Sequence, residues 1–228
     1  MTISDRPELP PEQVRVLGCL IEKQLATPQQ YPLTLNALTL ACNQSSNRDP
    51  VVSFDEPTVE LAVRTLKQRG LARFVHPTHG RSVLRYEHVL GSVFGLDDRQ
   101  LAILGVLLLR GPQTVGELRS RSERMVTFDD LAEVVHEIEL LTTQAGGLVA
   151  PVPRRPGQKE GRYVHLLGEG DPFGWAPPGP EVDLPARDDA AAGSPLVGAI
   201  ESLRQEMVAL RRQLDEVRTA LGMDPSDP

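Results

Sequence analysis

The sequence carries one string of elements twice, and this duplication limits the folds open to it more than any other feature. The segment Leu9–Leu20 aligns without a gap to Leu96–Leu107. Three further pairs follow in the same order: Pro32–Leu38 with Pro112–Leu118, Val52–Asp55 with Val126–Asp129, and Arg85–Leu90 with Arg162–Leu167. Four matches in order indicate a duplicated unit of roughly 75 to 85 residues, because repeated patterns mark repeated structural units.

The first copy, residues 1–95, predicts three helices followed by a β-hairpin, because apolar residues recur at three- and four-residue spacing in three windows. We expect Thr34 to cap the second helix, either Ser53 or Asp55 to cap the third, and Gly70 to end it. The expected inward residues are Val14, Leu17, Leu20, Ile21 and Leu25, then Leu35, Leu38, Thr39 and Cys42, then Val59, Ala62, Val63 and Leu66. The expected strands are 71–76 and 82–89.

The second copy, residues 96–170, repeats this order with cleaner signals. Gly111 and Pro112 end its first helix, and a longer third helix is expected over Phe128–Thr143, with Thr127 as its cap. The expected inward residues are Leu101, Leu104, Leu107 and Leu108, then Val115 and Leu118, then Leu131, Val134, Val135, Ile138 and Leu141. The expected strands are 148–152 and 162–167.

Three helices followed by a hairpin describe a winged helix, a helix-turn-helix variant in which the third helix reads a DNA groove and the hairpin forms the wing. The sequence therefore predicts a mainly α fold with small β-hairpins, of the α+β class. We expect two tandem winged-helix domains, residues 1–95 and 96–170.

The C-terminal part predicts a Pro- and Gly-rich flexible linker, 171–194, and a coiled-coil helix, 195–222. Apolar residues there alternate steps of four and three, which is a heptad seam. The seam consists of Leu196, Ile200, Leu203, Met207, Leu210, Leu214, Val217 and Leu221. Charges at the flanking positions favour a parallel dimer of two copies of the chain, since Glu206 would lie beside Arg211 of the second copy. The alternative is an amphipathic helix folded back onto its own domains.

Composition indicates a cytoplasmic protein. The start of the chain lacks the basic and apolar regions of a signal peptide, and no apolar run approaches the roughly 20 residues that a membrane span requires. In the cytoplasm a disulfide between Cys19 and Cys42 is not expected, and both are interpreted as small buried hydrophobic residues. The net charge of −7 comes mainly from residues 171–228, which hold five Lys and Arg against eleven Asp and Glu. Both copies are nearly neutral, which leaves room for a local basic surface.

Several short motifs resemble the YceH-like family of uncharacterised bacterial proteins. They are Glu22–Gln24, Tyr31–Leu33, Ala41–Gln44, Asn47–Val51, Leu107–Arg119 and Pro156–Glu160. The resemblance spans roughly Glu12–Leu167 and implies a bacterial source and a tandem winged-helix fold, but no activity. Ser45 stands where the family usually shows Lys, which removes a positive charge from the loop between the second and third helices.

That loop and the third helix of the first copy supply candidate DNA contacts. The candidates are Asn43, Gln44, Asn47 and Arg48 in the loop and Thr58, Arg64, Lys67 and Gln68 on the helix. Amides and guanidinium groups bind phosphates and base edges. In the alternative interpretation, the loop's Asn and Ser side chains bond to nearby backbone and hold the loop against the core.

The wings add further basic candidates, namely Arg81 in the first copy and Arg154, Arg155, Lys159 and Arg162 in the second. Surface loops are also basic for solubility alone, which is the competing interpretation. The third helix of the second copy is acidic: Asp129, Asp130, Glu133, Glu137 and Glu139 are all expected to face solvent. Such a helix would be repelled by DNA.

No catalytic motif, cofactor motif or metal-ligand spacing is found, so we expect a protein that is not an enzyme and holds no cofactor or metal. His88 and His165 each follow a Tyr by two positions on the last strand of their copy. Alternation places Tyr and His on one face, which indicates that they anchor the wing to the helices.

The leading hypothesis is a non-enzymatic protein that binds DNA through the first copy and the wings as a coiled-coil dimer. The alternative is a protein-interaction scaffold that does not bind DNA. Its contact sites would be the acidic third helix of the second copy together with Phe173 and Trp175.

Overall fold

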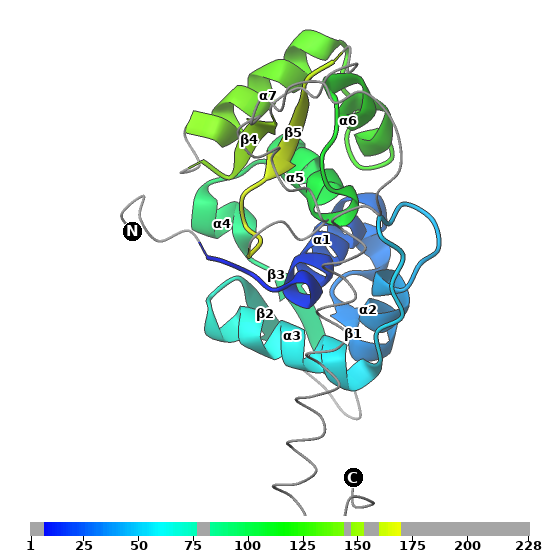
Figure 1. The fold of residues 1–228 in the computed structure, drawn as a ribbon. Helices are drawn as coiled ribbons and strands as arrows, with labels where there is room; N and C mark the ends of the chain where they lie inside the picture. Colours follow the sequence, from blue (N-terminus) through cyan, green and yellow to red (C-terminus); the bar gives the residue numbers. More distant parts are fainter. Residues whose placement is uncertain (1–6, 77–82, 144–146, 153–159, 170–228) are drawn as a thin grey trace, which may run out of the picture. The chain divides into compact units, whose positions relative to one another are not determined.

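The computed structural model describes residues 7–76, 83–143, 147–152 and 160–169. The linker 171–194, the helix 195–222 and the residues Phe173 and Trp175 lie outside the described residues. The described part is mixed α and β, with seven α-helices and two small antiparallel sheets (Figure 1). This confirms the α+β class.

The first copy forms three main helices and a small sheet. Its elements are α1 (Pro11–Ala26), η1 (Pro28–Gln30), β1 (Leu33–Thr34), α2 (Leu35–Cys42), α3 (Glu56–Gln68), β2 (Ala72–Val75), β3 (Arg85–His88) and α4 (Leu90–Phe94). The second copy follows with α5 (Asp98–Arg110), α6 (Val115–Ser122), α7 (Leu131–Thr143), β4 (Val149–Val152) and β5 (Arg162–His165). The order of helices and strands expected from the repeat is confirmed, while β1, η1 and α4 were not anticipated.

The two sheets pair equivalent segments of the two copies. In the first copy β3 lies between β1 and β2, with Phe74 opposite Tyr86. In the second copy β4 pairs with β5, and the backbones of Gln113 and Tyr163 exchange two hydrogen bonds of 3.0 and 2.8 Å. The segment before the second helix therefore bonds to the last strand in both copies.

Helix ends follow local capping chemistry. Thr34 accepts a hydrogen bond from the Ala37 N–H, and Asp55, rather than Ser53, caps α3 through the Thr58 N–H. Gly70 follows α3 with φ 72°, a left-handed conformation that Gly adopts without a Cβ clash.

The expected start of α7 is wrong. Thr127 is not its cap, because the helix begins at Leu131 and Asp130 accepts the Glu133 N–H at 2.9 Å. Phe128 is only 3 % exposed, and burying this ring in the core delays the helix. The later start also turns Leu131, expected inward, toward solvent at 49 % exposure.

The two copies share one hydrophobic core. In Figure 1, α1 and α5 lie next to each other between α3 and α7. Leu9, at the start of the first copy, bonds through its backbone to Leu167 and Glu169, at the end of the second. The expected inward residues Leu17, Leu20, Leu104 and Leu107 are all fully buried.

Candidate nucleic-acid interface

The loop between α2 and α3 is held by its own polar side chains. The Asn43 amide donates to the Phe54 carbonyl at 2.7 Å and accepts from the Phe54 N–H at 2.8 Å. Asn47 has φ 60° and accepts a 2.5 Å hydrogen bond from Arg110 in the second copy. For Asn43 the structure therefore shows the backbone contacts that the core-holding interpretation expects, whereas the Asn47 side chain bonds to an arginine side chain instead.

Arg48 is buried, with 5 % of the residue exposed. Its guanidinium donates to the Glu22 carboxylate at 2.6 and 3.1 Å and to the Ala41 carbonyl at 2.8 and 3.0 Å. It also donates to Gln44 and to the Asn47 carbonyl, so all three of its nitrogens are engaged inside the protein. This corrects the expectation that Arg48 contacts DNA, because the guanidinium would have to leave a buried carboxylate to do so.

Glu22 is the centre of this buried network and was assigned no role from the sequence, where it stood out only as part of the motif Glu22–Gln24. It is fully buried and receives Arg48 together with Arg124 from the second copy. Burial raises the pKa of Glu22, but the hydrogen bonds and charge of Arg48, with the charges of Arg124 and Lys23, outweigh burial and hold the pKa below its ordinary value. The sequence did hold a signal for this network, because a Glu directly follows Ile21 on a helix whose apolar stripe is expected to be buried.

The candidates on α3 lie at the surface. Arg64, Lys67 and Gln68 are exposed, whereas Thr58 is half-buried. Arg64 pairs with Glu60 one turn earlier at 2.6 Å, with 55 % of the Arg64 side chain exposed. Lys67 Nζ lies 4.5 Å from the centre of the Phe74 ring.

The β2–β3 hairpin carries further exposed cations. Arg69 is exposed directly after the end of α3. Arg73 on β2 and Arg85 on β3 are exposed on the adjoining sheet. Arg73 pairs with Glu87 across the sheet, and Arg85 donates to the Pro32 carbonyl at 2.8 Å. Arg64 and Lys67, the exposed cations of α3, are called the α3 basic surface below. Arg73 and Arg85 do not belong to it, because strand alternation places them on the sheet face opposite Phe74, the ring that Lys67 contacts.

Most wing candidates cannot be placed. Arg81, Arg154, Arg155 and Lys159 lie outside the described residues. Arg162 is half-buried and donates to Glu117 at 2.7 Å and to the Pro112 carbonyl at 2.8 Å, which ties β5 to the start of α6.

The third helix of the second copy differs partly from expectation. Glu137 was expected at the surface but is buried at 6 % exposure, where it accepts a hydrogen bond from Gln100 at 3.1 Å. Glu133 pairs with Arg99 at 3.2 Å. The helix still contains no Lys or Arg between Leu131 and Thr143.

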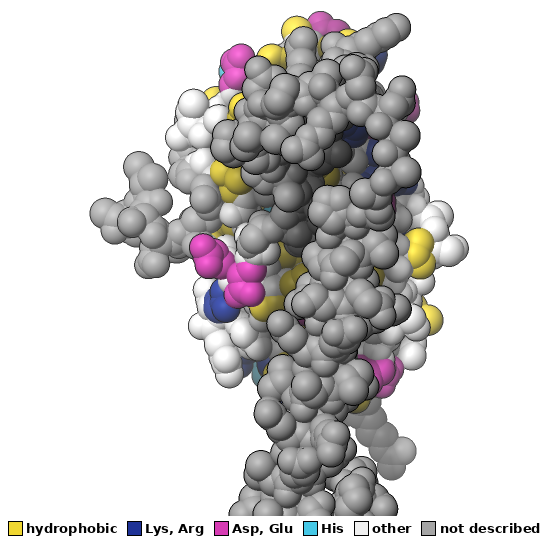
Figure 2. All heavy atoms as spheres, in the orientation of Figure 1, with side chains coloured by type: hydrophobic (Ala, Val, Ile, Leu, Met, Phe, Trp, Pro, Cys, Tyr) yellow, Lys and Arg dark blue, Asp and Glu magenta, His cyan; other side chains and the backbone are white. Residues whose placement is uncertain are grey.

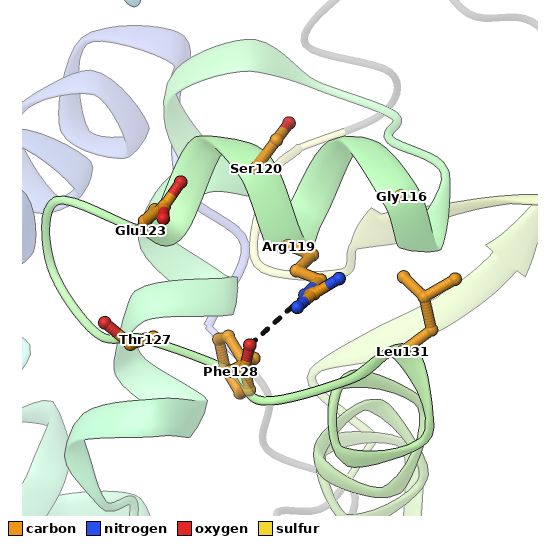
Figure 3. A pocket seen from close by; sticks show the side chains of 7 residues that line it. All are labelled: Gly116, Arg119, Ser120, Glu123, Thr127, Phe128 and Leu131. Atoms are coloured by element: carbon orange, nitrogen blue, oxygen red, sulfur yellow. Dashed lines mark hydrogen bonds between the residues drawn. The ribbon is translucent and has the colours of Figure 1, made fainter.

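A hollow of about 410 Å³ opens where α6 meets the loop before α7. Figure 3 shows Leu131 at its edge and the Arg119 side chain reaching Phe128, whose carbonyl it contacts at 3.2 Å. Arg119 also donates to the Asp129 carbonyl at 2.6 Å, so this side chain braces the loop.

The two repeated histidines are buried in equivalent places. His88 is 7 % exposed and His165 is 3 % exposed. Tyr86 is buried on the same strand face as His88, and the His88 N–H donates to the Tyr31 hydroxyl at 2.8 Å. Burial lowers the pKa of both imidazoles to about 4, so both are neutral at pH 7. These positions agree with the anchoring role.

Within the residues that the structure describes, no three His, Cys, Asp or Glu side chains gather as metal ligands would. Among the described helices, none combines the length and apolar character that a membrane span needs.

Comparison with known proteins gives a family. The model of a family described as "Protein of unknown function, DUF480" matches residues 9–158. A UPF0502 protein of Geobacter metallireducens is 47 % identical over 185 residues, covering 79 % of this chain and 84 % of the relative. A UPF0502 protein of Mesorhizobium japonicum is 45 % identical over 213 residues, covering 92 % and 97 %. These matches confirm the resemblance to YceH-like proteins, and the chain belongs to the DUF480 (UPF0502) family of uncharacterised bacterial proteins.

Proposed function

We propose that this chain is a non-enzymatic, cytoplasmic DNA-binding protein built from two tandem winged helices. In each copy the third main helix, α3 or α7, would be the counterpart of the groove-reading helix, and the strand pair after it would be the wing. DNA would be contacted by α3 and the basic wings, not by the acidic α7. The heptad seam of residues 196–221 supports a further proposal, that the chain dimerises through a parallel coiled coil.

The observation that carries the proposal is the α3 basic surface. The exposed cations of α3 are Arg64 and Lys67, beside the carboxylates Glu56 and Glu60, and Arg73 and Arg85 add charge on the hairpin, where Glu87 is the carboxylate. Exposed ion pairs contribute little, so phosphates can replace Glu60 and Glu87 as partners of Arg64 and Arg73. By contrast, α7 carries Glu133 and Glu139 without any Lys or Arg.

The geometry limits how the copies can bind. In Figure 1, α3 and α7 lie on opposite sides of the α1–α5 pair. One straight duplex therefore cannot receive both helices in neighbouring turns of its groove. This supports DNA contact by the first copy, with the second copy serving another purpose.

The test compares duplex affinity of the full chain with that of variants on α3. Arg64→Gln with Lys67→Gln should weaken binding, whereas Glu60→Gln should strengthen it, because the change removes a negative charge and frees Arg64. Thr142→Ala, on α7, is the matched control, and its affinity should not change. Equal affinity in all variants would contradict DNA contact by α3.

One observation favours the alternative, a protein-interaction scaffold. Leu40 on α2 and Leu61 on α3 are 64 % and 68 % exposed, and Leu61 lies one turn before Arg64. Contiguous exposed apolar patches mark protein contacts, and these two side chains would contribute apolar area to one. A chain that binds no duplex at low salt but loses a purified protein partner on Leu61→Glu would support this alternative.

A further inference from the structure

Arginines from separate parts of the chain converge where the two copies meet. Arg110 ends α5 and donates to Asn47 in the α2–α3 loop at 2.5 Å. Next to it, the Asp49 N–H donates to the Leu109 carbonyl at 2.9 Å. Arg124 follows α6 and reaches Glu22 of α1. The same carboxylate holds Arg48.

These cations are close enough to affect one another. Burial lowers the pKa of Arg110 first, and the positive charges of Arg121, Arg124 and Arg48 lower it further, against the opposing charge of Asp49. The guanidinium groups therefore lie in one positive field, although they come from α5, α6 and two loops.

The carboxylates at this place are too few to balance the cations. Glu22 is shared by Arg48, Arg124 and Lys23. Glu117 is shared by Arg162 at 2.7 Å and Arg121 at 3.5 Å. Around Glu22 the cations Arg48, Arg124 and Lys23 outnumber the one carboxylate, and Arg110 adds a charge that Asp49 opposes, which leaves a surplus of positive charge.

Part of this surplus is open to solvent. The Arg121 side chain is 32 % exposed and that of Arg124 is 42 % exposed, while Glu22, the partner of Arg124, is fully buried. Lys and Arg side chains are visible in the region of α6 in Figure 2. The ion pair of Arg124 with Glu22 links the two copies, which gives Arg124 a structural role. Arg121 makes no such link, because its carboxylate partner Glu117 lies on the same helix.

We propose that Arg110, Arg121 and Arg124, the junction arginines, form a binding site for a phosphate group. Guanidinium groups bind phosphate oxygens in pairs, and a doubly charged anion would relieve the repulsion among three neighbouring cations. The phosphate can belong to a nucleic-acid backbone or to a small phosphorylated ligand. The site lies apart from α3, so it does not depend on the proposed DNA contact there.

Calorimetry with pyrophosphate, at ionic strength held constant with NaCl, tests the site in the full chain. Wild type should bind, and Arg110→Gln with Arg121→Gln should bind at least tenfold more weakly. Arg121→Lys, which keeps the charge but loses the paired donors of the guanidinium, should bind with an affinity between these two. Arg99→Gln, which removes an arginine of the same copy, should bind as wild type does. Circular dichroism and the unfolding midpoint check that each variant is folded.

Duplex DNA is the second probe and distinguishes the sources of phosphate. If the backbone is the ligand, the double variant should weaken duplex binding and reduce the slope of log K against log salt by about 1.8, for two lost contacts. If a small ligand is bound, pyrophosphate affinity should fall in this variant while duplex affinity stays the same. Changing Arg64 and Lys67 should leave pyrophosphate affinity unchanged, which separates this site from α3. Wild type binding neither probe, or a double variant that binds both as wild type does, would overturn the proposal.

Discussion

Gly18 of α1 lies directly against Leu109 of α5, so closely that a Cβ at position 18 would come to 2.9 Å from Leu109 Cγ and Cδ2. The equivalent glycine of the second copy, Gly105, lies against Ile21 of α1, where a Cβ would meet Cγ2 at 3.0 Å. Each copy thus places a glycine where the helix of the other approaches. This reciprocal contact is what merges the two copies into one core.

Gly18→Ala should destabilise the chain. Overpacking costs about 1–3 kcal/mol, more than the roughly 1 kcal/mol that Ala gains over Gly inside a helix. Gly105→Ala should cost less, because its Cβ would meet one atom at 3.0 Å and the next only at 3.5 Å, whereas three atoms lie within 3.0 Å at position 18. Gly116→Ala, which has nothing within 4 Å, is the control and should stabilise α6. Urea unfolding measures all three, and Gly18→Ala unfolding at the same midpoint as Gly116→Ala would refute the close packing.

Glu22→Gln should be strongly destabilising. The change leaves Arg48 and Arg124 facing a neutral amide, and breaking a buried ion pair costs about 3–5 kcal/mol. Glu60→Gln, which breaks an exposed pair, should change the free energy of unfolding little. Denaturant unfolding of the two variants gives the comparison, and equal losses would contradict the burial of Glu22.

Stability should fall with acidification because of His88 and His165. Their folded pKa of about 4 lies below the ordinary value of 6.5. The unfolded chain therefore binds more protons between these values, and stability present above pH 6.5 is lost as pH falls toward 4, by up to about 1.4 kcal/mol per pH unit for each histidine. Glu22, whose folded pKa lies below 4.5, loses its contribution only at lower pH.

Unfolding free energies at pH 7.5, 6 and 5 measure this slope. In a chain with both His88→Gln and His165→Gln the slope should be shallower, whatever the absolute stability. An unchanged slope in that variant would show that other groups carry the pH dependence.

Deleting residues 195–228 tests the proposed coiled coil. Light scattering should report a dimer for the full chain and a monomer for the shortened one, because the heptad seam would be the dimer contact. A mass per particle that drops only by the deleted residues would contradict it.

The sequence was most informative where local chemistry decides the structure. Thr34 and Gly70 mark helix ends through hydrogen bonds and backbone conformation within a few residues, so both could be predicted. The start of α7 could not, because the tertiary burial of Phe128 overrides the capping potential of Thr127. The short β1 strand also depends on a partner, β3, that lies far along the chain.

The candidate sites were harder to predict, because ion-pair partners come from distant residues. Arg48 is a residue type that often contacts DNA, and its position in a polar loop suggested that role. Its ion pair with Glu22 forms only when the chain folds. Arg110 and Arg124 likewise look like ordinary surface residues until α5 and the end of α6 meet the first copy. The exposed positions of Arg64 and Lys67 were predictable, since helical periodicity separates them from the stripe that includes Val63 and Leu66.

The most direct test of the proposed function is a salt titration of the full chain with a fluorescent duplex. Fluorescence anisotropy should show binding with a Kd of roughly 10⁻⁴ to 10⁻⁶ M near physiological salt and affinity that rises steeply as salt is lowered, because released counterions drive phosphate contact. Absence of binding to any duplex at low salt would contradict the account.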